Sequence, residues 1–254
     1  MNSPTAPGAA HPFETLTPDV VLDALESVGL RGDGRLTALS SYENRVYQVQ
    51  LEDGAPVVAK FYRPERWSDA QIQEEHDFAA ELLAAEVPVV APMALNGQTL
   101  HSTAGFDFSV SPLRGGRPPE LDDFEVLEWI GRFLARILTV GAAKPFVHRP
   151  TLDVQTFALE PAQWLQTHQM IPLEVEREWR DALVPALTLI QAAFAQGAAE
   201  RKLLRLHGDC HPGNILWTPT DLPGGGPHFV DLDDARMGPA VQDLWMLLSG
   251  DRRQ

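Results

Sequence analysis

The sequence predicts an α+β fold of two lobes, with a small, mostly antiparallel sheet and one inserted helix preceding a mainly helical lobe. Short segments of alternating apolar residues fill the chain up to about residue 111. Beyond it, apolar residues recur at helical spacing. The segment SPLRGGRPPE between them is rich in Gly and Pro and marks a boundary. We therefore expect a disordered tail (1–12), a first lobe (13–111), a linker (112–117) and a second lobe (118–254).

The first lobe is predicted to begin with a helix that Thr17 caps, with Pro18 in its first turn and Gly29 at its end. A second helix starts near Ser68, carries apolar residues on one face and ends before Pro88. Strands are expected at 36–39, 44–51, 55–63, around 98 and at 106–111. The first three strands are expected to form a meander, and residues 13–111 as a whole a small, mostly antiparallel sheet with one inserted helix.

The second lobe is predicted to contain helices over 124–138 and 172–196, and Pro185 is expected to kink or divide the second of these. Two short strands follow, KLLRL at 202–206 and HFVDL at 228–232, and a polar cluster comes after each. If these two strands pair, the two polar clusters are brought together.

Composition excludes several classes of partner. The chain carries 20 Lys and Arg against 35 Asp and Glu, a formal charge of −15, which repels nucleic acid and anionic membrane surfaces. No apolar stretch reaches the length of a membrane span, and the N-terminal residues lack the features of a signal peptide. The single cysteine, Cys210, excludes an internal disulfide. We expect a cytoplasmic monomer.

The polar clusters suggest phosphoryl transfer. Asp209 and Asn214 lie five residues apart after one strand, and Asp231 follows the next strand. Phosphoryl transfer needs a carboxylate to accept the proton of the attacking hydroxyl, and an amide oxygen with a second carboxylate to hold Mg²⁺ on the nucleotide phosphates. These three residues supply that set.

The same residues carry a family resemblance. HGDCHPGNIL, followed by FVDLDDARMGPAVQDLW, resembles the aminoglycoside phosphotransferase and choline kinase-like branch of the protein-kinase fold. Protein kinases read His-Arg-Asp, four residues, Asn, whereas here His207-Gly208-Asp209 is followed after four residues by Asn214. Within this branch the chain is similar to bacterial stress-response Ser/Thr protein kinases, through SYENRVYQ, KFYRPERW, EEH, VPV, HRPT, LRLHGDCH and VQDLWMLL.

The resemblance implies an ATP- and Mg²⁺-dependent kinase that phosphorylates Ser or Thr hydroxyls of proteins, its own included. It implies that Asp209 is the catalytic base and that Asn214 and Asp231 are the Mg²⁺ ligands. The nucleotide contacts that it implies come from the first lobe. Lys60 meets the phosphates and pairs with Glu75, or with Glu74 as the fallback, and Ser41 lies in the turn over the phosphates.

Two features depart from the family pattern. The turn LSSYENRVY contains no glycine, where larger-class protein kinases have G-x-G-x-x-G, so phosphate contacts must come from backbone N–H groups and from the hydroxyls of Ser40 or Ser41. Family members also continue for several tens of residues of helix beyond the Asp-Leu-Trp segment, whereas this chain stops at Gln254. We therefore expect an incomplete second lobe.

The same residues are also compatible with other functions. A small-molecule kinase of the aminoglycoside, choline or homoserine type shares both motif blocks, and a nucleotide-binding scaffold without turnover is suggested by the glycine-free turn. Zinc at His207, Cys210 and His211 is disfavoured because no second Cys/His pair lies at ligand spacing. Asp243 is expected to brace the catalytic loop by hydrogen bonds, and His207 to pack beneath it. Asp233 and Asp234 either tune or help to bind the metal, or are solvated or cap the following segment.

Overall fold

The computed structural model describes residues 11–196 and 201–248, which form two compact units. The first comprises the described residues up to Glu120 together with Gly213–Asp233, and the second comprises Leu121–Pro212 and the described residues from Asp234 onward. The expected tail lies, except for residues 11 and 12, outside the described residues, as do residues 249–254. The lobe boundaries proposed from composition stay a prediction.

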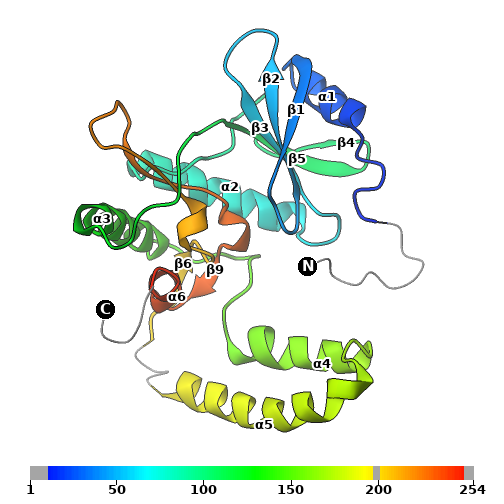
Figure 1. Ribbon diagram of the computed structural model, residues 1–254, viewed down its shortest axis with the longest axis vertical. Coiled ribbons are helices and arrows are strands. Elements are labelled where there is room, and N and C mark those ends of the chain that lie inside the picture. Colours follow the sequence, from blue (N-terminus) through cyan, green and yellow to red (C-terminus); the bar gives the residue numbers. More distant parts are fainter. Residues whose placement is uncertain (1–10, 197–200, 249–254) are drawn as a thin grey trace. The chain divides into compact units, whose positions relative to one another are not determined.

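The first unit contains a five-stranded antiparallel sheet, as predicted, in the order β1-β2-β3-β5-β4. Figure 1 shows the strands fanning out above helix α2. The strands are β1 (Gly32–Leu39), β2 (Arg45–Leu51), β3 (Val57–Phe61), β4 (His101–Thr103) and β5 (Phe106–Pro112).

The two faces of the sheet have different roles because side chains alternate along a strand. Ala59 and Phe61 of β3 enter a core that includes Val21 and Leu25 of helix α1 (Pro18–Ser27). Lys60, between them in sequence, lies on the other face and lines a cavity. The sheet therefore separates a structural core from the functional face.

Both helices of this unit begin at side-chain caps. The hydroxyl of Thr17 accepts a hydrogen bond from the backbone N–H of Val20 at 3.4 Å, as expected for the start of α1. Helix α2 (Asp69–Ala84) begins with a capping box in which Ser68 and Gln71 satisfy each other's backbone N–H groups. The cap sets the start of α2, the helix that carries the buried Glu75.

The prediction that KLLRL pairs with HFVDL is wrong. The first becomes β6 (Leu204–Leu206) and pairs in the second unit with β9 (Arg236–Gly238). The second becomes β8 (Gly226–Phe229) and pairs in the first unit with β7 (Ile215–Thr218), a strand that the sequence reading omitted. A four-residue apolar run carries too little periodicity to identify β7.

The second unit is mainly helical, as expected. Its helices are α3 (Phe124–Gly141), a π-helical turn η1 (Gln155–Leu159), α4 (Glu160–Thr167), α5 (Leu173–Ala195) and α6 (Val241–Trp245). Short 3-10 turns lie at Pro212–Asn214 (η2) and Leu232–Asp234 (η3). Pro185 does not divide α5, which runs as one helix through it, and neither η1 nor α4 was predicted. Within residues 11–196 and 201–248, no helix has the length and apolarity needed to cross a membrane.

Candidate active site

The first unit encloses a cavity of about 530 Å³ on the functional face of the sheet. This volume lies in the usual range for small-molecule and cofactor sites. Five of the six site residues named from the sequence line the cavity, namely Ser41, Lys60, Glu75, Asn214 and Asp231. They come from the β1–β2 turn, β3, α2, the turn just before β7 and the segment after β8. The fold thus gathers residues that are up to 190 positions apart in the sequence.

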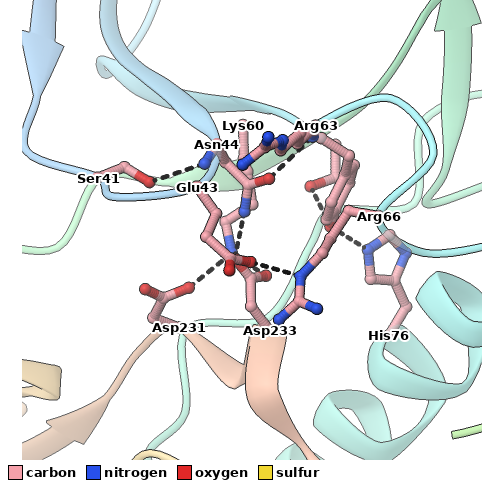
Figure 2. Close-up of polar contacts among 11 residues, drawn as sticks. Ser41, Glu43, Asn44, Lys60, Arg63, Arg66, His76, Asp231 and Asp233 are labelled. Atoms are coloured by element: carbon pink, nitrogen blue, oxygen red, sulfur yellow. Dashed lines mark hydrogen bonds and ion pairs between the residues drawn. The ribbon is translucent and has the colours of Figure 1, made fainter. Parts of the chain in front are cut away.

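Lys60 forms ion pairs with two aspartates. Its Nζ lies 2.9 Å from Oδ1 of Asp231 and 2.5 Å from Oδ1 of Asp233 (Figure 2). Burial alone would lower the pKa of Lys60, but the carboxylates of Asp233, Asp231 and Glu75 together raise this pKa well above its ordinary value. Lys60 is therefore a permanent cation in the cavity.

Glu75, rather than Glu74, fits the expected helix carboxylate. Its side chain is buried and lines the cavity, and its charge acts on Lys60. The ion pairs of Lys60 in this structure go to the two aspartates instead, so direct pairing of Lys60 with Glu75 stays a prediction.

Hydrogen bonds from Asn44 order the glycine-free turn. The backbone N–H of Asn44 donates to the hydroxyl of Ser41 at 3.3 Å, so this hydroxyl is held at the edge of the cavity. The Asn44 side chain donates to Asp233 and accepts from the backbone N–H of Arg63 at 2.9 Å (Figure 2). In a glycine-rich loop, backbone N–H groups surround the phosphate. In this turn, hydrogen bonds of Asn44 fix the conformation instead.

Asn214 and Asp231 lie together through the β7–β8 hairpin. The backbone N–H of Val230 donates to the carbonyl of Asn214 at 3.0 Å, which places Asn214 beside the segment that leads to Asp231. Asp231 has a positive φ of 62°, a conformation that non-glycine residues seldom adopt and that occurs often at functional sites.

This donor set fits Mg²⁺. An amide oxygen and a carboxylate are hard ligands, and Mg²⁺ in phosphoryl-transfer sites is held by one or two carboxylates plus substrate phosphates and waters. In the part of the chain that the structure describes, no group of three or more His, Cys, Asp or Glu side chains could hold a metal by itself.

Asp209, the sixth predicted residue, belongs to the second unit, and the chain passes from it to Asn214 in the first unit within five residues. The loop that carries it requires glycine at its preceding position. Gly208 has a φ of +88°, and a Cβ there would lie 1.9 Å from the carbonyl oxygen of Asp234.

The expectation that Asp243 braces this loop is confirmed. Its two carboxylate oxygens accept hydrogen bonds from the backbone N–H groups of His207 at 2.9 Å and Gly208 at 2.8 Å. Asp243 is fully buried, and this burial raises its pKa above the ordinary value although His207 and the two N–H donors oppose the shift. His207 is itself buried, as the packing role requires.

Sequence reasoning missed one member of the site and left another undecided. Asn44 was not singled out, and Asp233 was expected either to tune or bind metal or to be solvated or cap the following segment. Asp233 is instead an ion-pair partner of Lys60. The sequence places Asp233 only two residues after Asp231, which is a weak signal for Asp233. Asn44 carries no such signal, because its contacts with Arg63 and Asp233 exist only in the folded chain.

Comparison with known proteins gives the family. The model of the phosphotransferase enzyme family matches residues 35–254. The chain is 49% identical over 246 residues to stress response kinase A of Escherichia coli strain K12, which covers 97% of this chain and 72% of the relative. It is 47% identical over 245 residues to the serine/threonine protein kinase RdoA of Salmonella typhimurium strain LT2, with 96% and 72% covered.

Solved structures share the fold at lower identity. A microcompartment-associated aminopropanol kinase superposes with a TM-score of 0.71 at 18% identity, covering 91% of this chain and 74% of that one. An amicoumacin kinase in complex with AMP-PNP, Ca²⁺ and Ami gives a TM-score of 0.68 at 19% identity, covering 90% of this chain and 67% of that one. These likenesses confirm the two-lobed, kinase-like α+β fold. The chain belongs to the phosphotransferase enzyme family and is an ATP-dependent phosphotransferase.

Proposed function

We propose that this protein is an Mg·ATP-dependent Ser/Thr protein kinase of the bacterial stress response, which transfers the γ-phosphoryl group to protein hydroxyls, its own included. The observation that carries the proposal is the convergence of Lys60, Glu75, Asn214 and Asp231 on one cavity. Relatives at 47–49% identity that are named as stress response or serine/threonine kinases support the choice of substrate class. The net negative charge of the chain argues against nucleic acid as a partner.

Each residue has a chemical task in this proposal. Lys60 neutralises charge on the nucleotide phosphates, and the hydroxyl of Ser41 donates to them from the turn. Asn214 and Asp231 would hold Mg²⁺, which neutralises the charge that develops during transfer. Asp209 accepts the proton of the attacking hydroxyl, and Asp243 positions the loop that carries Asp209.

Positioning and charge neutralisation provide most of the rate in such a reaction, because the transferred group passes through a loose transition state with little covalent chemistry for the protein to perform. A cavity with one permanent cation among three carboxylates suits this task. It accepts a metal-bound polyphosphate better than a bare anion, since the metal offsets the repulsion between phosphates and carboxylates.

The test is transfer of label from γ-labelled ATP with Mg²⁺, with and without a generic protein substrate, beside Asp209→Asn. Label on protein that depends on Asp209 is the expected result. Absence of protein label, with ADP released only when an aminoglycoside, choline or homoserine is added, would replace the protein-kinase proposal with a small-molecule kinase. Nucleotide binding without either product would instead make the protein a scaffold.

A further inference from the structure

The interaction network around Asn44 is not needed for any step assigned so far. Asn44 is only 3% exposed and lies just before β2, at the end of the glycine-free turn. Its side-chain oxygen accepts from the N–H of Arg63, which lies two residues after β3, and its side-chain nitrogen donates to Asp233 after β8. A buried amide whose oxygen and nitrogen both have partners is a strong local constraint, because losing either partner leaves a desolvated polar group.

Asp233 completes the network. One of its carboxylate oxygens accepts from Asn44 and the other from Lys60, so a single carboxylate joins the turn to the catalytic lysine (Figure 2). The two aspartates that contact Lys60 differ in exposure, with 14% of the Asp233 side chain exposed against 45% for Asp231. The more exposed carboxylate is the one available to a metal ion, and the more buried one is the one that stays on Lys60.

We propose that Asn44 and Asp233 are positioning residues that hold Lys60 and the Ser41 turn in fixed relation, so that both meet the phosphates of one nucleotide. This inference rests on the proposed function for the identity of the ligand. Asn44 orients Asp233, Asp233 holds Lys60 when Asp231 engages Mg²⁺, and the backbone of Asn44 holds the Ser41 hydroxyl. The network replaces the glycines that the turn lacks.

The sharpest test exchanges the two polar groups. Asn44→Asp puts two carboxylates in contact and is expected to raise both the Kd for a non-hydrolysable ATP analogue with Mg²⁺ and the KM for ATP at least tenfold. The double variant Asn44→Asp with Asp233→Asn restores an amide–carboxylate pair, because residue 233 then donates and residue 44 accepts from both residue 233 and Arg63. It also keeps an oxygen for Lys60, and we expect its Kd to return to within about fivefold of wild type.

The matched control is Asn96→Asp, the same substitution at an exposed asparagine in the turn before β4. It should leave Kd, KM and kcat unchanged. A double variant no better than Asn44→Asp, or an Asn44→Asp protein that binds the analogue as wild type does, overturns the proposal. If Asn44→Asp does not fold, Asn44→Ala, Asp233→Asn and the combination of the two test the inference. Residues of one network weaken binding less than additively when they are changed together, so fully additive effects refute the inference.

The readouts separate this inference from the proposed function. If the wild-type protein binds the analogue but labels no protein, the substrate assignment fails while the Kd series still decides the role of the network. If the wild-type protein does not bind the analogue at all, the inference is refuted together with the nucleotide site.

Discussion

The cavity of the first unit and the loop that carries Asp209 in the second unit both depend on carboxylates, but they use them differently. In the cavity, Asp231 and Asp233 contact the cationic side chain of Lys60, so charge is balanced against charge. In the loop, Asp243 accepts hydrogen bonds from two backbone N–H groups and so holds the backbone next to Asp209 in place. The same residue type thus serves as a counter-ion in one unit and as a backbone brace in the other.

Because of this difference, we expect mutations in the cavity and mutations in the loop to alter different measured properties. Removing a charge from the cavity should mainly alter nucleotide binding, because the side chains there would meet the ligand. Removing the brace from the loop should mainly lower stability, since it strands buried N–H groups that no water can reach. The binding measurements on the Asn44 and Asp233 variants test the cavity, and the following predictions, in order of expected effect, mainly test the loop.

The largest effect is expected for Asp209→Asn. Removing the general base should lower the rate of phosphoryl transfer by about 10²- to 10⁴-fold while leaving the Kd for the ATP analogue unchanged. The control is Asp221→Asn, the same change at an exposed aspartate in the β7–β8 loop. Equal losses of rate in both variants, or a parallel loss of nucleotide affinity in Asp209→Asn, would contradict the assigned role.

Gly208→Ala tests the backbone of the catalytic loop. A Cβ at this position faces both an unfavourable φ and a carbonyl oxygen at 1.9 Å, so we expect the free energy of unfolding to fall by at least about 3 kcal/mol. Gly29→Ala is the matched control, because Gly29 has a similar φ of +86° but no atom within 4 Å of the added Cβ. That variant should lose only about 1 kcal/mol. Urea unfolding of the two variants separates the cost of the backbone conformation from the cost of the steric clash.

Asp243→Asn is expected to lower the free energy of unfolding by about 2 kcal/mol, because the amide group keeps one acceptor and points its N–H₂ at a backbone donor. Asp123→Asn makes the same change at the exposed N-cap of α3, where Asn caps as well as Asp does. Stability should therefore change little there. Similar losses in the two variants would show that Asp243 is not a specific brace.

The smallest effect concerns pH. Burial, followed by the charge of Arg114, lowers the pKa of His228 below its ordinary value of 6.5. The folded state therefore binds fewer protons than the unfolded state, so this contribution to stability is complete above pH 6.5 and is lost as the pH falls through the lowered pKa. Between pH 7.5 and 5.5, His228→Asn should lose less stability than wild type does. If the melting temperature of His228→Asn depends on pH as that of wild type does, His228 does not contribute to the pH dependence of stability.

Much of the site was predictable because its residues follow local rules. Asp209 and Asn214 lie in the polar segment between β6 and β7, Asp231 comes directly after the apolar residues Phe229 and Val230, and Lys60 alternates with apolar residues on β3. Helix caps at Thr17 and Ser68 were likewise written in the sequence next to the helices that they begin. Signals of this kind act over a few residues and need no knowledge of distant neighbours.

Strand pairing was predicted less well. KLLRL and HFVDL have the composition of partners, but they pair with other segments, β9 and β7. The choice between partners depends on register and on packing against the rest of each unit, which periodicity within a four-residue run does not encode. The continuity of α5 through Pro185 is a second example, since the proline was expected to kink or divide this helix.

The sequence by itself predicted the chemistry of this protein, through the types and spacing of an expected base (Asp209), two expected metal ligands (Asn214 and Asp231) and an expected phosphate-binding lysine (Lys60). Only the tertiary structure decided the partners of that lysine. Asp233 and Asn44 lie 189 residues apart in the chain, and their contact depends on the turn before β2 and the segment after β8 meeting at one edge of the cavity. A hydrogen bond requires two groups to come within a few ångströms, and for residues so distant in sequence only the folded chain sets that distance.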